Sequence, residues 1–231
     1  PAVDVLDRVG PNRFVARLAN GGVDLQLPDG GKPNLSIILG GVAANLEQLV
    51  GAYTAFANAG VAAAPRYTPG QASRRRRLLS PGAAWIVRDI LSSNPADVEG
   101  APIPGTADHA GLAWKTGTSY GYRDAWAIGV NDRWTLGVWV GRPDGTPSPG
   151  SFGAITALPL LFQIGDMLPA RGGVHRPRPY SVRAVDVCWP LGGAADATDP
   201  ALCRQRRHAW VLNDVLPPTF PDRGLGAWTN P

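Results

Sequence analysis

The residue types with the clearest capacity for chemistry lie in one short run, Lys115-Thr116-Gly117-Thr118. The lysine supplies a fixed positive charge, and each threonine adds a hydroxyl that can both donate and accept a hydrogen bond. We expect the run to be a β-strand, so that Thr116 and Thr118 share one face and act on one ligand. Gly117 would let a ligand or a neighbouring backbone approach closely. At a sheet edge the free amides of such a strand can pair with an extended peptide, so the run predicts a site for a peptide that ends in a carboxylate.

The segments before this run have the pattern of helices. Asn45 to Ala59 is the strongest of them, with Asn45 and Gln48 as a capping box and Gly60 as a stop. Its expected inward face is Leu46, Leu49, Val50, Tyr53, Phe56 and Ala57. Further helices are expected over Ala2 to Val9, from Pro11 to Gly21, and from Ser80-Pro81 to Asn94-Pro95 with an apolar stripe of Ala83, Val87, Ile90 and Leu91.

The period of the pattern then changes to that of strands. We expect strands over Ala110 to Ser119, Asp124 to Val130 and Trp134 to Val140, the last two joined as an antiparallel hairpin by Asn131-Asp132-Arg133. A closing helix is expected over Gly153 to Leu168, with a kink at Pro159. Helices followed by an antiparallel sheet and a closing helix predict an α+β fold.

Composition divides the chain into two parts. With 44% hydrophobic residues, the chain can bury a sizeable core, which we place in residues 1–168. Residues 169–231 are rich in proline and glycine and are expected to be a linker-like extension or the start of a C-terminal domain. No stretch approaches the roughly 18 apolar residues that a membrane span needs.

Several segments together resemble the penicillin-binding family, most closely its class A bifunctional members of the 1C type. The matching stretches, in chain order, are LGGVAANLEQLVGAYTAFANAGV (Leu39 to Val61), LSPGAAWIVRDIL (Leu79 to Leu91), KTGTSYGYRDAWAIGV from Lys115 and WTLGVWVGRPDGTP from Trp134. A lone Lys-Thr-Gly-Thr is weak evidence, since it also occurs as an ordinary surface strand, but several matching segments in order are far more specific. The resemblance covers about residues 1–168 and implies part of a penicillin-binding, serine β-lactamase-like transpeptidase fold.

The resemblance also implies a chemistry. In that family a serine of an S-x-x-K motif attacks the peptide bond between two D-alanines, and β-lactam antibiotics acylate the same serine. Carried over, Lys115 would support the proton network and Thr116 and Thr118 would bind the terminal carboxylate of a peptidoglycan stem peptide. The amide of Thr118 would provide half of the oxyanion hole. No metal or other cofactor is implied.

The sequence departs from the family at its nucleophile. Neither lysine, Lys32 or Lys115, lies in an S-x-x-K motif, and the only Ser-x-Asn is Ser92-Ser93-Asn94, in the wrong context. We therefore expect both motifs upstream of Pro1, in the N-terminal half of a longer protein, with a glycosyltransferase domain and a membrane anchor. The parent would be a periplasmic enzyme of the inner membrane, and this chain alone would be inactive. Two alternatives stay open: a non-catalytic binding or scaffold module of the same fold, and a β-lactamase or β-lactam sensor.

Two further features allow more than one interpretation. Cys188 and Cys203 are expected to form a disulfide if the protein is periplasmic; free thiols, or a zinc site with His208, are the alternatives. The run Arg74 to Arg77 could bind nucleic acid or anionic lipid, but a solvated loop is the preferred interpretation, because no aromatic residues interleave with it. We expect no nucleic-acid partner.

Overall fold

The computed structural model describes residues 2–93, 97–98, 101–102, 111–169, 176–189, 192–203 and 205–216. The chain divides into two compact units, Pro1–Arg176 and Pro177–Pro231. The first unit therefore extends slightly beyond Leu168, where composition placed the end of the core.

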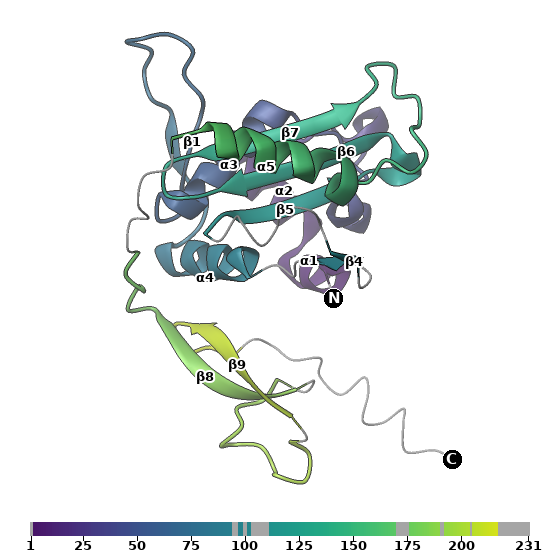
Figure 1. The fold of residues 1–231 in the computed structure, drawn as a ribbon. Helices are drawn as coiled ribbons and strands as arrows, with labels where there is room; N and C mark the ends of the chain where they lie inside the picture. The colour runs from purple at the N-terminus through teal and green to yellow at the C-terminus, as the bar shows by residue number, and fades with distance from the viewer. Residues whose placement is uncertain are drawn as a thin grey trace, which may run out of the picture. The chain divides into compact units, whose positions relative to one another are not determined.

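The first unit combines helices with short antiparallel sheets, which confirms the predicted α+β class (Figure 1). Its elements are α1 (Ala2–Val9), α2 (Pro11–Asn20), η1 (Pro28–Gly30), η2 (Leu35–Leu39), α3 (Leu46–Ala57), β1 (Val61–Ala63), β2 (Arg75–Arg77), α4 (Pro81–Ser92), β3 (Asp97–Val98), β4 (Ala101–Pro102), β5 (Ala113–Thr118), η4 (Tyr120–Tyr122), β6 (Asp124–Val130), β7 (Thr135–Gly141), η5 (Gly153–Ala157) and α5 (Leu158–Met167).

The main sheet has the order β5-β6-β7, and both pairings are antiparallel. Strand β6 has the predicted bounds and β7 begins one residue later than predicted, whereas the predicted Ala110 lies outside the described residues. The Asn131 side chain fixes the turn of the predicted hairpin, because its Oδ1 accepts from the amides of Arg133 (2.9 Å) and Trp134 (2.7 Å). Strand β5 lies at an edge of this sheet within the described part of the chain.

Helices cover both faces of the sheet. On one face Leu158, Leu161 and Phe162 of α5 are buried against the sheet, and α5 crosses this face in the front of Figure 1. On the other face α3 packs so closely that a Cβ on Gly137 would lie 2.4 Å from Val50 Cγ2. Tight packing on both sides leaves the three strands little room to shift.

The predicted helix of residues 45–59 forms α3, with two corrections. Asn45 Oδ1 accepts from the amides of Glu47 and Gln48, as an N-cap should, but Gln48 does not complete a capping box. Its Oε1 accepts instead from the amide of Asp24, 3.0 Å away. The fully buried residues are the small Gly51, Ala52 and Ala55, while the predicted large apolar side chains are only half-buried.

The predicted apolar stripe of α4 was wrong. Val87 and Ile90 are exposed, and the buried residues are Gly82, Ala84 and Arg88. The arginine is buried because its Nη2 lies 2.8 Å from Asp132 Oδ1 in the β6–β7 turn. A charge whose partner is far away in the sequence cannot be recognised from periodicity alone. The predicted end at Asn94-Pro95 lies outside the described residues, and α4 itself ends at Ser92.

The closing helix begins with a π-turn, η5, before α5. Pro159 lies in the first turn of α5, directly after η5, where π-helical hydrogen bonding changes to α-helical. The kink expected at this proline stays a prediction.

The second unit contains two strands that sequence analysis did not predict, β8 (Val182–Trp189) and β9 (Gln205–Leu212). They pair antiparallel along their whole length. Arginine side chains lie over two tryptophans, with Arg207 Cζ 4.9 Å from the ring centre of Trp189 and Arg178 Cζ 5.6 Å from that of Trp210. An isolated two-stranded hairpin is marginally stable in water, so this unit needs further stabilisation.

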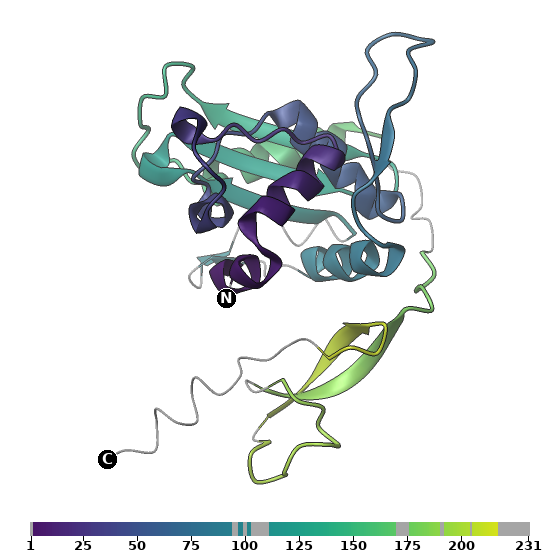
Figure 2. The ribbon, with the colours of Figure 1, turned by 180° about the vertical axis from the view of Figure 1, so that it is seen from behind.

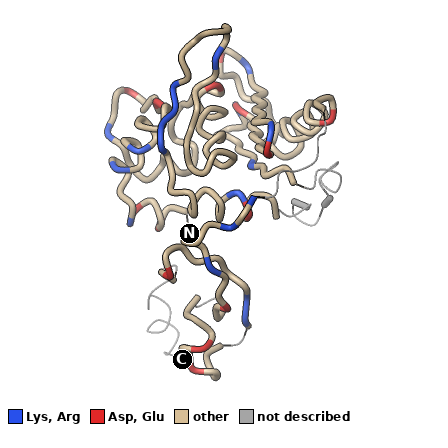
Figure 3. Tube along the Cα trace, turned by 90° about the vertical axis from the view of Figure 1, so that its left-hand side faces the viewer, with Lys and Arg blue, Asp and Glu red and all other residues tan. Residues whose placement is uncertain are grey.

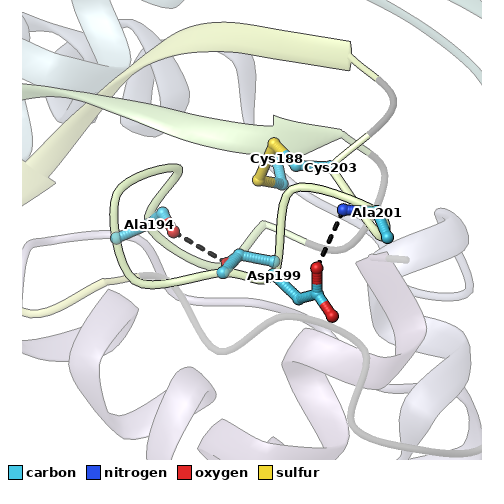
Figure 4. The surroundings of a disulfide bond; sticks show 6 residues. Cys188, Ala194, Asp199, Ala201 and Cys203 are labelled. Atoms are coloured by element: carbon cyan, nitrogen blue, oxygen red, sulfur yellow. Dashed lines mark hydrogen bonds between the residues drawn. A yellow bond between two sulfur atoms is a disulfide. The ribbon is translucent and has the colours of Figure 1, made fainter.

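A disulfide between Cys188 and Cys203 supplies part of that stabilisation (Figure 4). Their Cα atoms are 5.0 Å apart, and the Cys188 side chain is fully buried. The loop between them is held internally as well, because Thr198 Oγ1 donates to Ala194 O and Ala201 N donates to Asp199 Oδ1.

Reducing the disulfide, or changing both cysteines to serine, should destabilise the second unit by about 3 kcal/mol, as the chain-entropy model gives for a loop of this size. Hydrogen exchange should show faster exchange in β8 and β9 and unchanged exchange in β5–β7. Intact mass before and after reduction would show whether both thiols are oxidised. Free thiols in the native protein would show that the disulfide does not form. An unchanged rate of hydrogen exchange in the reduced hairpin would show that the disulfide does not stabilise β8 and β9.

Candidate functional site

The Lys-Thr-Gly-Thr run forms the C-terminal part of the edge strand β5. Lys115 is paired in register with Ile128, Thr116 with Ala127 and Thr118 with Ala125 of β6. The Lys115 and Thr118 side chains are exposed, and Thr116 and Gly117 are half-buried. The run therefore lies on a strand, as its sequence predicts, and the sheet order leaves the other edge of this strand unpaired by the described strands.

The two threonines share one face of β5, as expected. This is the face of Trp114, whose ring packs edge-to-face on Phe162 of α5 at 6.0 Å between centroids. Lys115 alternates to the opposite face, and its Nζ donates to Thr116 O over 2.8 Å. The positive charge and the hydroxyls thus lie on two sides of one strand, so a ligand could contact both only along the strand's outer edge.

The Thr118 hydroxyl has a fixed partner that sequence analysis did not foresee. Its Oγ1 accepts from the amide of Gly153, 3.0 Å away, at the start of η5. One acceptor position is thereby filled, and the hydroxyl proton is left to donate to another group. Such a proton suits a carboxylate oxygen, which only accepts hydrogen bonds.

Gly153 approaches β5 so closely that only glycine fits. A Cβ there would lie 2.4 Å from Gly117 O and 2.7 Å from Trp126 O, both backbone atoms. By contrast, a Cβ on Gly117 would meet only Trp126 Cβ, at 3.6 Å. The close backbone approach that we expected at Gly117 therefore depends on the absence of a side chain at Gly153. The sequence does offer a signal for this contact, because Gly153 is the first residue of a helix that follows the strands.

The turn after β5 is held by hydrogen bonds and ring contacts. Ser119 Oγ accepts from the amide of Asp124 (2.9 Å), and Asp124 Oδ1 accepts from Trp139 Nε1 (2.8 Å). The Tyr122 ring packs edge-to-face on Phe152 at 5.0 Å, next to Gly153. These contacts fix the end of the strand that carries Thr118.

The described residues contain no group of three or more His, Cys, Asp or Glu side chains that could hold a metal ion. The zinc alternative for Cys188 and Cys203 fails in the structure, because the cysteines bond to each other and His208 Nδ1 contacts Asp186 instead. Nor does the described part of the chain include a helix long and apolar enough to cross a membrane.

The strand, its sequence and the helices around it resemble the sheet side of a penicillin-binding domain, and the second unit points to the same class of protein. Residues 181–211, which cover β8 and most of β9, match the family model of the penicillin-binding protein 1C linker domain.

Individual relatives make the resemblance specific. The chain is 49% identical over 222 residues, 95% of its length, to penicillin-binding protein 1C of Escherichia coli strain K12. It is 31% identical over 149 residues to penicillin-binding protein 1A of Aquifex aeolicus strain VF5. The expected resemblance to class A penicillin-binding proteins of the 1C type is thereby confirmed.

A solved structure shows the same fold. The crystal structure of penicillin-binding protein 1A from Haemophilus influenzae superposes with a TM-score of 0.70 over 94% of this chain, at 14% sequence identity. The chain covers 38% of that structure, 28% of the E. coli protein and 20% of the Aquifex protein. It thus spans less than half the length of each of these relatives.

Proposed function

We propose that this chain is the C-terminal part of a serine D,D-transpeptidase domain that crosslinks peptidoglycan stem peptides. The observation that carries the proposal is the exposed edge strand β5 with Lys115, Thr116 and Thr118, inside a chain similar to penicillin-binding protein 1C over 95% of its length. An exposed edge with hydroxyls and a lysine suits an extended peptide with a C-terminal carboxylate.

Each residue of the run has a role in this proposal. Thr118 donates its free proton to the substrate carboxylate, and Thr116 binds the same carboxylate from the same face. Lys115 contributes positive charge close to the reacting serine, which lowers the energy of the anionic groups there. The amide of Thr118 stabilises the oxyanion that forms when the serine attacks the D-alanyl carbonyl.

The nucleophile would come from another part of the parent protein. The serine hydroxyl loses its proton to a neighbouring base, bonds to the carbonyl carbon and expels the terminal D-alanine as an amine. An amine of a second stem peptide then displaces the serine. The chain contains no S-x-x-K, so we propose that it does not form the acyl-enzyme alone. The parent would be periplasmic and anchored in the inner membrane, with no cofactor in this reaction.

A non-catalytic binding module is the second candidate, and the same absence of S-x-x-K favours it. The two differ in what lies upstream in the parent. An S-x-x-K motif in that sequence supports the enzyme, and its absence there supports the binding module.

Replacing Thr118 by valine should weaken binding of a peptide ending in D-Ala-D-Ala by about tenfold or more, because a hydrogen bond to a charged group is lost. The affinity can be followed by an NMR titration of the 231-residue chain. Thr135→Val, on the far strand β7, is the matched control and should leave the affinity unchanged. Equal affinities for the two variants would contradict the role of Thr118.

A further inference from the structure

A basic arm, residues 61–77, projects from the first unit. Strands β1 and β2 form its base, with Val61 paired to Arg77 and Ala63 to Arg75. The Ala64 amide donates to Arg74 O (3.0 Å), and at the far end the Tyr67 amide donates to Gln71 Oε1 (2.9 Å). Every residue from Arg66 to Arg77 is exposed, whereas Ala62 at the base of the arm is buried in the core, and the arm stands clear of the helices and the main sheet in Figures 1 and 2.

The charge of the arm is unbalanced. The segment from Gln48 to Arg88 contains no Asp or Glu, and its six arginines make it more basic than the whole chain, whose net charge is +4. Five of them lie in the arm, Arg66 and Arg74 to Arg77, and the last four appear as a continuous blue stretch in Figure 3. Within the described residues no ion pair joins any of these five arginines to a carboxylate. Four adjacent like charges repel one another, which is unfavourable unless an anion binds.

Within the described residues, Arg77 is the arginine of the run whose side chain makes hydrogen bonds. Arg77 Nη1 donates to Ala59 O and Leu79 O, both at 3.2 Å, and so ties the base of the arm to the core. Arg75 and Arg76 lie on β2, which Arg74 directly precedes, and a strand presents successive side chains on opposite sides. Glu47, at the start of α3, is the carboxylate next to the Tyr67 phenol, and its interaction with the phenol raises the pKa of Tyr67.

We propose that the basic arm is a second binding surface, for a polymer that carries many carboxylates. The inference rests on the proposed function, because the cell-wall polymer whose peptides β5 would bind is such a polymer. Guanidinium groups pair with carboxylates through two parallel hydrogen bonds. Adjacent arginines that point to opposite sides of the arm can each reach a different carboxylate, as a polymer with repeated carboxylates allows and a small ligand does not. The arm would hold the polymer near the enzyme while β5 selects one peptide end.

The test is co-sedimentation of the 231-residue chain with isolated peptidoglycan sacculi. The variant R74Q/R75Q/R76Q, which keeps Arg77, should bind about tenfold less, because charge-assisted contacts are lost. The control R8Q/R13Q/R17Q removes the same charge from exposed positions of α1 and α2 and should bind like the wild type. When the carboxylates of the sacculi have been converted to neutral amides, the wild-type chain should bind these sacculi as weakly as the arm variant binds untreated ones. Added salt should weaken the binding of the wild type to untreated sacculi.

Three results would overturn the proposal: equal binding by the arm variant and the control, full binding to neutralised sacculi, or tighter binding to acidic lipid vesicles or DNA at equal anion concentration. The NMR titration with the D-Ala-D-Ala peptide separates this proposal from the proposed function. The arm variant should bind that short peptide normally. If the arm variant binds the peptide normally and also binds sacculi as well as the wild type does, the arm proposal alone fails. If the wild-type chain binds no peptide, the proposed function fails.

Discussion

Gly153→Ala should destabilise the first unit by about 3 kcal/mol, the upper end of typical overpacking costs. The new Cβ would overlap Gly117 O and Trp126 O, which are backbone atoms that cannot rotate away. The β5–β6 pair or the start of η5 must move, and the hydrogen bond from Gly153 N to Thr118 Oγ1 should be lost. Denaturant unfolding measures the first effect, and chemical-shift changes at Thr118 report the second.

Gly165→Ala is the matched control. It makes the same chemical change inside α5, where a Cβ would meet only Leu136 Cδ1 at an ordinary 3.7 Å. Alanine favours a helix interior over glycine by about 1 kcal/mol, so this variant should be as stable as the wild type or more so. If the free energy of unfolding falls for Gly153→Ala and stays equal or rises for Gly165→Ala, the cause at Gly153 is its contact with β5 and not the loss of a glycine as such. Similar stability for both variants would contradict the close approach at Gly153.

Asp132→Asn should cost about 3–5 kcal/mol, the usual cost of breaking a buried ion pair. The Arg88 side chain is only 7% exposed, and its charge would lose the carboxylate 2.8 Å away. Arg176 makes the loss worse. Burial, and then the charge of Arg88, lower the pKa of Arg176, while Asp132 opposes that shift. Two arginines would face each other without their shared counter-charge. Denaturant unfolding of the first unit provides the measurement.

Removing the arginine as well should recover stability. Arg88→Met in the Asp132→Asn background takes away the uncompensated charge, so the double variant should be more stable than Asp132→Asn alone. Asp144→Asn is the surface control and should change stability little, because Asp144 is exposed and an asparagine Oδ1 can still accept from the Thr146 amide. A double variant less stable than the single one would mean that Arg88 stabilises α4 independently of Asp132.

The periodicity of the sequence predicted the scaffold of the site well. Alternation located β6 and β7, and cap residues located the start of α3, because these signals are local. Strand β5 was recognised from its chemistry and its period together. The resemblance of several further segments to penicillin-binding proteins then indicated a binding site at this run, which four residues alone could not establish.

The failures share one physical cause, which is that the deciding partner lies far away in the chain. Arg88 is buried by Asp132, and Gln48 is diverted from its cap by Asp24. The Thr118 hydroxyl is oriented by Gly153, from a segment that sequence analysis treated only as a helix. In the second unit, prolines and glycines concealed two strands whose stability depends on a disulfide rather than on a large core.

We propose that Lys115 to Thr118 form one wall of a site that penicillin acylates, with the serine supplied by another part of the parent protein. Intact-mass spectrometry after incubation with benzylpenicillin tests it most directly, on the 231-residue chain and on a longer product that includes upstream sequence with an S-x-x-K motif. We expect one covalent penicillin on the longer protein and an unmodified mass for the 231-residue chain. A stoichiometric adduct on the short chain, or none on the longer protein, would contradict the account.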